Sequence, residues 1–204
     1  GDMNRLETDT FYIGNSSNIV IDHCSFLWGV DEVLSAYPNE SLTIQWSIVG
    51  EALGNSVHSK GFHGFGGIWG SSASYHHNLI VHNSDRNPRF MSYLEPPYPS
   101  DRLIDLRNNV IYDWGTNTSH SGQGLDFNMV NNYYKWGRST REDRKTFFFT
   151  GGDNSTAYIH GNTMEGSPDL TADNTLGVRN PGPGVVLSTA EIARSGAYPA
   201  TSVT

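Results

Sequence analysis

Short segments in which apolar and polar residues alternate recur along the chain, separated by polar turns rich in asparagine and glycine. Alternation with a period of two is typical of β-strands that bury one face, and helical periodicity is almost absent. The alternating segments are 18–26, 42–49, 73–81, 103–115, 125–137 and 156–166. The pattern therefore predicts an all-β protein built from many short strands.

The segments also share one recurring position. When they are aligned, one column holds Cys24, Trp46, Asn78, Asn109, Asn132 and Asn162, in steps of 22 to 32 residues. A repeat of this kind with loop insertions is typical of a solenoid, in which each coil buries its face against the next. Stacked asparagine side chains can hydrogen-bond along the stacking axis, although asparagine is also common in ordinary turns. We interpret the column as an asparagine ladder and predict a parallel β-helix.

Long segments interrupt the repeat at 50–72 and 86–102. Loops of this length inside a solenoid are usually functional or disordered. We expect residues 1–175 to form the β-helix, with its long loops on one side.

The C-terminal region, 176–204, differs in character from the repeats. Ser188 precedes Glu191 by three residues, which is the spacing of a capping box at a helix N-terminus. We therefore predict a short helix at about 189–195, within a tail that packs on the solenoid.

Charge narrows the possible partners. The 204 residues include 13 Lys and Arg against 21 Asp and Glu, a net charge of −8, which argues against nucleic acid or an anionic membrane as a partner. A polyanionic substrate would require a local cation.

Cys24 is the only cysteine, so no disulfide can form within the chain. No apolar run approaches the ~20 residues of a membrane span, and no signal peptide is visible.

Acidic residues gather near the amino terminus. Glu7 and Asp9 are two residues apart, so on a strand both carboxylates point to the same face. Asp22, Asp31 and Glu32 also lie in the first two segments, and a carboxylate from the next coil would complete an oxygen site for a hard cation such as Ca²⁺. The alternative is a set of solvated acids on a turn.

Two cations and several histidines lie near the segment HHNLIVHNSDRNPRF. Lys60 belongs to a glycine-rich loop, HSKGFHGFGGIWG, that also contains His58 and Trp69, and its aromatic residues are candidates to pack on sugar rings. Arg86 follows the segment's His-His-Asn motif and is a candidate for a chemical role. The alternative is that it forms an ion pair with the neighbouring Asp85. The histidines also suggest a zinc site, but adjacent histidines on a strand point to opposite faces and none has helical i, i+4 spacing.

Four segments together resemble the pectate lyases of polysaccharide lyase family 1: IVIDHCSFLWGVDE, YHHNLIVHNSDRNPRF, DLRNNVIYDWG and VNNYYKWG. The resemblance covers about residues 7–175. It implies a right-handed parallel β-helix that cleaves α-1,4-polygalacturonate by calcium-assisted β-elimination, leaving 4,5-unsaturated oligogalacturonides. It also implies a secreted or periplasmic protein.

The same resemblance assigns roles to individual residues. Arg86 matches the catalytic base, and Lys60 matches a substrate-binding lysine. We add Arg89, and His58 and Trp69 of the glycine-rich loop, as further candidate substrate contacts. The calcium-ligand positions match Glu7, Asp9, Asp31 and Ser35. Asp22 and His23 match an Asp-His motif that we interpret as structural.

The sequence departs from the family pattern at three places. A second arginine, expected five residues after Arg86, is Met91, and Arg89 is the candidate to replace it. The last calcium-ligand position, often Asp, is Ser35, which predicts weak or substrate-dependent calcium binding. Coils that usually precede the Glu7 region are absent from this sequence, so we expect a fragment, a nicked enzyme or a second chain that supplies them.

Other functions remain as alternatives. A pectin lyase-like enzyme would prefer methylated polymer, and a non-catalytic β-helix would bind the polysaccharide without cleaving it. A hydrolase on the same fold needs paired Asp residues as acid and base, and such a pair is not evident. Zinc-dependent chemistry is the fourth alternative.

Overall fold

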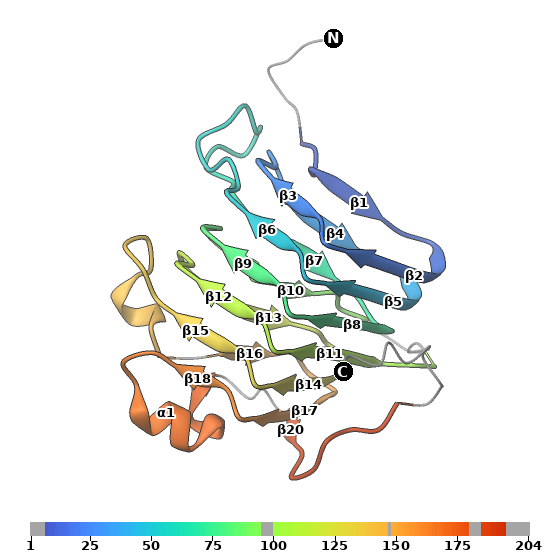
Figure 1. Ribbon diagram of the computed structural model, residues 1–204, viewed down its shortest axis with the longest axis vertical. Helices are drawn as coiled ribbons and strands as arrows, with labels where there is room; N and C mark the ends of the chain where they lie inside the picture. Colours follow the sequence, from blue (N-terminus) through green and yellow to red (C-terminus); the bar gives the residue numbers. More distant parts are fainter. Residues whose placement is uncertain (1–6, 95–99, 147, 180–184, 195–204) are drawn as a thin grey trace.

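The computed structural model describes residues 7–94, 100–146, 148–179 and 185–194. Its strands form three sheets in which every pairing is parallel, and successive coils stack from the N-terminal to the C-terminal end (Figure 1). This confirms the predicted parallel β-helix. Strands of one sheet lie about 4.8 Å apart, so residues far apart in sequence become neighbours along the stack.

Each sheet takes one strand from successive coils. Sheet A contains β1 (Phe11–Ile13), β4 (Leu34–Ala36), β7 (Ile68–Trp69), β10 (Arg89–Phe90), β13 (Ser119–Ser121), β16 (Phe149–Gly151) and β19 (Val178–Arg179). Sheet B contains β2 (Ser16–Asp22), β5 (Asn39–Gln45), β8 (Ala73–His76), β11 (Leu103–Arg107), β14 (Asp126–Val130), β17 (Ser155–His160) and β20 (Val185–Leu187). Sheet C contains β3 (Ser25–Leu27), β6 (Ile48–Gly50), β9 (Leu79–Val81), β12 (Val110–Tyr112), β15 (Tyr133–Lys135) and β18 (Thr163–Met164).

Helices are few and short in the described residues. They are α1 (Pro168–Ala172) and the 3-10 turns η2 (Glu142–Arg144) and η3 (Asn174–Gly177). No helix in this part of the chain is long and apolar enough to cross a membrane.

A buried asparagine ladder runs along the corner between sheets B and C. Asn78 donates its backbone N–H to Oδ1 of Asn109 at 2.9 Å, and Asn109 donates likewise to Asn132 at 3.0 Å. The ladder continues through Asn162 to Asn174. Each carboxamide therefore satisfies a backbone group of the neighbouring coil, as predicted for this column.

The ladder column includes Ser47 rather than Trp46, which corrects the alignment by one residue. The Ser47 backbone N–H donates to Asn78 Oδ1 at 3.0 Å, and its hydroxyl accepts from the Cys24 backbone at 3.1 Å. Trp46 occupies the preceding position, where the backbone is left-handed (φ 49°), and stacks on His77 at 4.4 Å between ring centroids. A serine can replace the carboxamide because it too combines an acceptor with a donor.

The core between the sheets is apolar and rich in aromatic rings. Trp69 and Phe90 pair in register on sheet A and are both buried. Phe90 packs on Phe127 with ring centroids 4.6 Å apart, and Phe127 packs on Phe149 at 5.1 Å. Aromatic stacking along the axis gives each coil a large buried area that it could not gain alone.

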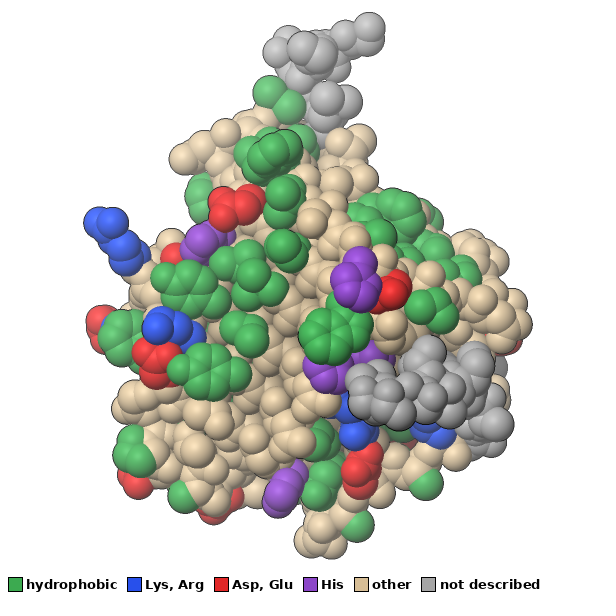
Figure 2. Space-filling view, in the orientation of Figure 1, with side chains coloured by type: hydrophobic (Ala, Val, Ile, Leu, Met, Phe, Trp, Pro, Cys, Tyr) green, Lys and Arg blue, Asp and Glu red, His purple; other side chains and the backbone are tan. Residues whose placement is uncertain are grey.

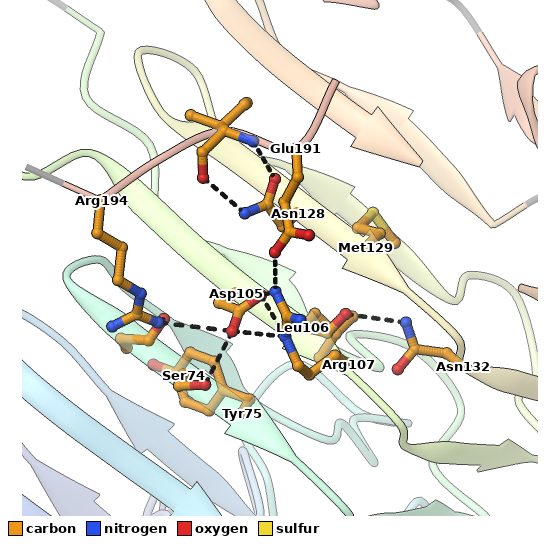
Figure 3. A network of polar contacts seen from close by, with 12 residues as sticks. Ser74, Tyr75, Asp105, Leu106, Arg107, Asn128, Met129, Asn132, Glu191 and Arg194 are labelled. Atoms are coloured by element: carbon orange, nitrogen blue, oxygen red, sulfur yellow. Dashed lines mark hydrogen bonds and ion pairs between the residues drawn. The ribbon is translucent and has the colours of Figure 1, made fainter. Parts of the chain in front are cut away.

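The predicted helix at 189–195 is wrong, because residues 189–194 run as bends and coil. The Ser188 hydroxyl bonds locally to Ala190 instead of capping a helix. Asn128 on β14 exchanges two 2.9 Å hydrogen bonds with the backbone of Ile192, which holds this segment against sheet B (Figure 3). Arg107 pairs with Glu191 at 2.5 Å.

The structure describes the first long loop fully and the second in part. The segment 51–67 joins β6 to β7, between sheets C and A, and residues 95–99 of the second lie outside the described residues. Strands β19 and β20 continue sheets A and B beyond residue 175, so the sheets do not end at the expected boundary.

The N-terminal coils carry many exposed apolar side chains. Phe11, Tyr12, Val20 and Trp28 are all exposed. Figure 2 shows hydrophobic side chains gathered over this end of the solenoid, toward the top of the view. A second chain covering this end stays a prediction.

The ladder generates a stability prediction. We expect Asn109→Ala to lower the free energy of unfolding by about 2–5 kcal/mol, because it leaves the Asn78 N–H and the Tyr75 carbonyl buried without their partner. Urea unfolding followed by circular dichroism measures the change. Ser17→Ala, at an exposed position of sheet B, is the control and should change stability by less than about 0.5 kcal/mol. A comparable small effect of Asn109→Ala would contradict the ladder's role.

Candidate functional site

One row of side chains follows the outer surface of sheet A. The strand register aligns Ile68, Arg89 and His120 on neighbouring coils, with Ser35 one strand before Ile68. The alternate residues, such as Phe90, point into the core. This row borders the turns that enter sheet A, where acidic residues and Arg86 lie.

Three carboxylates converge at the start of this face. Oxygen atoms of Asp9, Asp31 and Glu32 all lie within 4.8 Å of one another. Backbone pairing fixes the arrangement: the Glu32 N–H donates to Asp9 Oδ1 at 3.1 Å, and the Asp31 N–H donates to the Thr8 carbonyl at 3.2 Å. Asp31 lies in a bend and Glu32 in an isolated bridge to Phe65, both before β4 and outside a regular strand, so both can reach the cluster.

The cluster concentrates negative charge. Burial raises the pKa of the Asp9 carboxyl above its ordinary value, and the Asp31 carboxylate adds to the rise, while Ser35 and Arg86 act in the opposite direction. Closely spaced carboxylate oxygens are the ligands that a hard cation such as Ca²⁺ prefers. The donor set therefore fits the predicted metal, with Asp9 and Asp31 brought together as expected.

Glu32 is the functional candidate that sequence reasoning missed. The signal available was its position, beside Asp31 in an acidic pair directly before the buried strand β4.

Arg86 lies beside this cluster, in a left-handed backbone conformation (φ 57°). Its guanidinium forms an ion pair with the buried Glu32 carboxylate and lies over the Phe65 ring, 4.4 Å from the centroid. Burial lowers the pKa of Arg86, and the nearby Arg89 lowers it further, while the carboxylates of Asp31 and Asp9 oppose the shift.

The alternative ion pair between Arg86 and Asp85 is not formed. The Asp85 carboxylate accepts the Arg86 backbone N–H at 2.6 Å, the Thr116 hydroxyl at 2.7 Å and the Asn117 amide at 2.9 Å. Asp85 thus holds the turn, and the Arg86 side chain is directed to Glu32.

The segment 51–67 closes one side of the site. Glu7 is exposed and accepts a hydrogen bond from the Ser59 hydroxyl, so it contacts this segment rather than joining the three-carboxylate cluster. That hydrogen bond, followed by the charges of Lys60 and His58, lowers the pKa of Glu7. Lys60 is exposed at the tip of the segment.

Two predicted substrate contacts are buried, which corrects their assignment. Trp69 is 1% exposed, donates its indole N–H to the Leu34 carbonyl at 3.0 Å and belongs to the core. The His58 side chain is wholly buried and faces Asp31, with Nε2 3.7 Å from Oδ2. Neither ring is available to stack on a sugar.

Arg89 is better placed for substrate contact. It lies on the outward row of sheet A, and its guanidinium makes no ion pair or hydrogen bond with the described residues. The positive charge of Arg89 lowers the pKa of Arg86. Burial raises the pKa of Tyr37, and the charge of Arg89 partly offsets this rise. Met91, in place of the family's second arginine, is half-buried at the end of β10.

Sequence comparison links the chain to curated fungal proteins. It is 32% identical over 178 residues to a protein named "Probable pectate lyase C" from Aspergillus flavus, and equally to its namesake from Aspergillus oryzae. A third protein of that name, from Emericella nidulans, is 30% identical over 174 residues. Each match covers 83% of this chain but only 37–38% of the relative. No family model matches the chain.

The contact between Arg86 and Glu32 generates a stability prediction. In the absence of added metal, Arg86→Gln should lower the free energy of unfolding by about 3 kcal/mol, because a buried carboxylate loses its counter-charge beside two others. The double variant Arg86→Gln/Glu32→Gln should recover most of the loss. Urea unfolding of wild type and the three variants, including Glu32→Gln alone, gives the coupling between the two residues. An additive pair of effects would show that the two side chains do not interact.

Proposed function

The chain has a family relationship with pectate lyases, and on that premise we propose that the outer face of sheet A binds polygalacturonate and cleaves it by calcium-assisted β-elimination. The observation that carries the proposal is the contact between Arg86 and a three-carboxylate cluster in the turns that enter sheet A. Because the chain spans about two fifths of its relatives (38% for Aspergillus flavus), activity of the whole protein is part of the proposal.

Asp9, Asp31 and Glu32 are the residues that would hold calcium, with the Ser35 hydroxyl next to Asp9. When bound, calcium supplies positive charge that neutralises the sugar carboxylate and makes the neighbouring C5 proton more acidic. The all-oxygen donor set supports this choice of metal. Glu7, which the family resemblance also assigned, would contribute only after leaving Ser59.

Lys60 and Arg89 are the cations proposed to position the polymer. Lys60 extends from the exposed segment 51–67, and Arg89 lies on the outward row beyond Arg86. Both carry positive charge at neutral pH, so each can pair with a galacturonate carboxylate. This local charge allows a chain of net charge −8 to accept an acidic polymer.

Arg86 is proposed to be the base. Its neutral guanidine takes the C5 proton of the sugar, the C4–O glycosidic bond breaks, and a C4=C5 double bond forms in the new non-reducing end. The departing oxygen keeps the bonding electrons and takes a proton from water, which leaves a hydroxyl on the released sugar. Guanidinium groups rarely lose a proton, but burial and Arg89 both favour the neutral form here. The carboxylates of Asp31 and Asp9 oppose this lowering of the Arg86 pKa, so neutralising their charge would favour the neutral form further. We also infer that the protein acts outside the cell, where its polymeric substrate lies.

A direct assay tests the reaction class. With polygalacturonate, we expect ultraviolet absorbance from unsaturated product that disappears with chelator and returns when calcium is restored. Asp9→Asn and Asp31→Asn should raise the calcium concentration for half-maximal rate at least about tenfold, because each removes an ionised ligand. Asp22→Asn, an exposed carboxylate at another corner, is the control. Binding without turnover, or preference for methylated pectin without calcium, would favour the alternative functions.

The role of Arg86 is tested separately from its effect on stability. The double variant Arg86→Gln/Glu32→Gln removes the base while avoiding an unpaired buried carboxylate, so we expect a folded protein whose kcat falls about 10²–10⁴-fold. Glu32→Gln alone serves as the matched control and should keep a measurable kcat at high calcium. Similar kcat values for the two proteins would remove Arg86 from the chemical step.

A further inference from the structure

A second group of metal donors lies behind the carboxylate cluster. His58 and His63 belong to the segment 51–67, which folds back over the preceding coil so that both rings meet Asp31. The rings stack nearly parallel, with centroids 3.8 Å apart and an interplanar angle of 9°. Their ring nitrogens and an Asp31 oxygen all lie within 4.8 Å of one another.

The donor separations match those of a tetrahedral metal site. Ligand atoms about 2.0–2.2 Å from a tetrahedral zinc ion lie roughly 3.4 Å from each other. Here His63 Nε2 is 2.6 Å from Asp31 Oδ1, and His58 Nε2 is 3.7 Å from Asp31 Oδ2. These distances lie on either side of the required value. Because nitrogen lone pairs lie in the plane of each stacked ring, one ring must also turn out of the stack for both nitrogens to reach one ion.

An independent observation points to a ligand at this place. The His58 side chain is 0% exposed, and its Nε2 atom has no hydrogen-bond partner within the described residues, although it faces Asp31. Buried polar atoms normally have a partner, so an unsatisfied imidazole nitrogen aimed at a carboxylate requires an explanation. A bound cation would satisfy it.

We propose that His58, His63 and Asp31 form a site for a borderline transition metal such as Zn²⁺, which competes with calcium for Asp31. Two imidazoles and one carboxylate suit zinc, whereas calcium prefers oxygen ligands throughout. Three protein ligands leave a fourth position open to water. Since Asp31 belongs to both clusters, zinc at this site lowers calcium affinity and inhibits cleavage.

Zinc binding also has a consequence for the Lys60 backbone. In the metal-free protein the Lys60 N–H donates to His58 Nδ1 at 3.1 Å, which leaves the neutral ring's proton on Nε2. Coordination through Nε2 moves this proton to Nδ1, which then cannot accept from Lys60. The freed amide lies in an exposed segment, where water replaces the lost acceptor.

Calorimetric titration of the calcium-free protein with zinc chloride tests the site directly. We expect one zinc ion per chain, and at least tenfold weaker binding by His63→Phe and by His58→Phe. The exposed His23→Phe is the matched control and should bind like wild type. If one variant fails to fold, the other still decides. Unchanged zinc affinity in both folded variants, or no binding by wild type, overturns the proposal.

The competition rests on the proposed function, and a second measurement separates the two ideas. In the lyase assay, zinc should raise the calcium requirement of wild type at least about tenfold but have little effect on His63→Phe. Zinc that binds at one per chain without raising this requirement overturns the competition. Calcium-independent cleavage would instead count against the proposed calcium chemistry, while the zinc titration would still judge the site.

Discussion

The hydrogen-bonded ladder at the corner of sheets B and C is the constraint on which the rest of the structure depends. Each carboxamide accepts a backbone N–H from the preceding coil and donates to a carbonyl, so a one-residue slip would leave several buried groups unpaired. The ladder thus fixes the register of neighbouring coils. Because each coil contributes one strand to every sheet, sheet A has the same register, and residues of neighbouring coils lie one strand spacing apart.

This shared register brings the residues of the candidate site together. Asp9, Glu32 and Arg86 come from three separate coils, yet their side chains meet because the intervening turns pair through Glu32, Phe65 and Asp85. The ladder lies at a different corner of the coil, so its asparagines are not residues of the candidate site. The Arg86–Glu32 ion pair, in contrast, is expected to contribute both to stability and to the proposed chemistry.

Sequence reasoning predicted the solenoid because its physical basis is local. Alternation marks the strands, and Asn78 to Asn162 mark one corner. Ser47 was missed as a ladder residue because its hydroxyl makes the contacts that a carboxamide makes in the other coils. The capping-box spacing at Ser188 predicted a helix that does not form, because Asn128, far away in sequence, binds the Ile192 backbone. Tertiary contacts of this kind leave no pattern in the local sequence.

The site was predicted less completely, for reasons that particular residues show. Asp9, Asp31 and Arg86 were assigned from the sequence, the last through family resemblance, and the structure places them close together. Trp69 was assigned to substrate because an aromatic residue in a glycine-rich loop suggests sugar binding, but it already belongs to β7, and alternation turns it into the core. Glu32 was missed because it lies outside a regular strand, in an isolated bridge to Phe65. Its side-chain direction depends on the backbone path, which composition does not specify.

Asp31 connects these conclusions, because it faces carboxylates on one side and two imidazoles on the other. Carboxylate oxygens favour a hard cation, and imidazole nitrogens favour a softer one, so one shared ligand couples the choice between metals. The segment that supplies the imidazoles also carries Lys60, whose amide contacts His58. On these proposals, the ion that Asp31 holds would affect the Lys60 backbone beside His58, and metal identity and substrate binding would be linked through a single side chain.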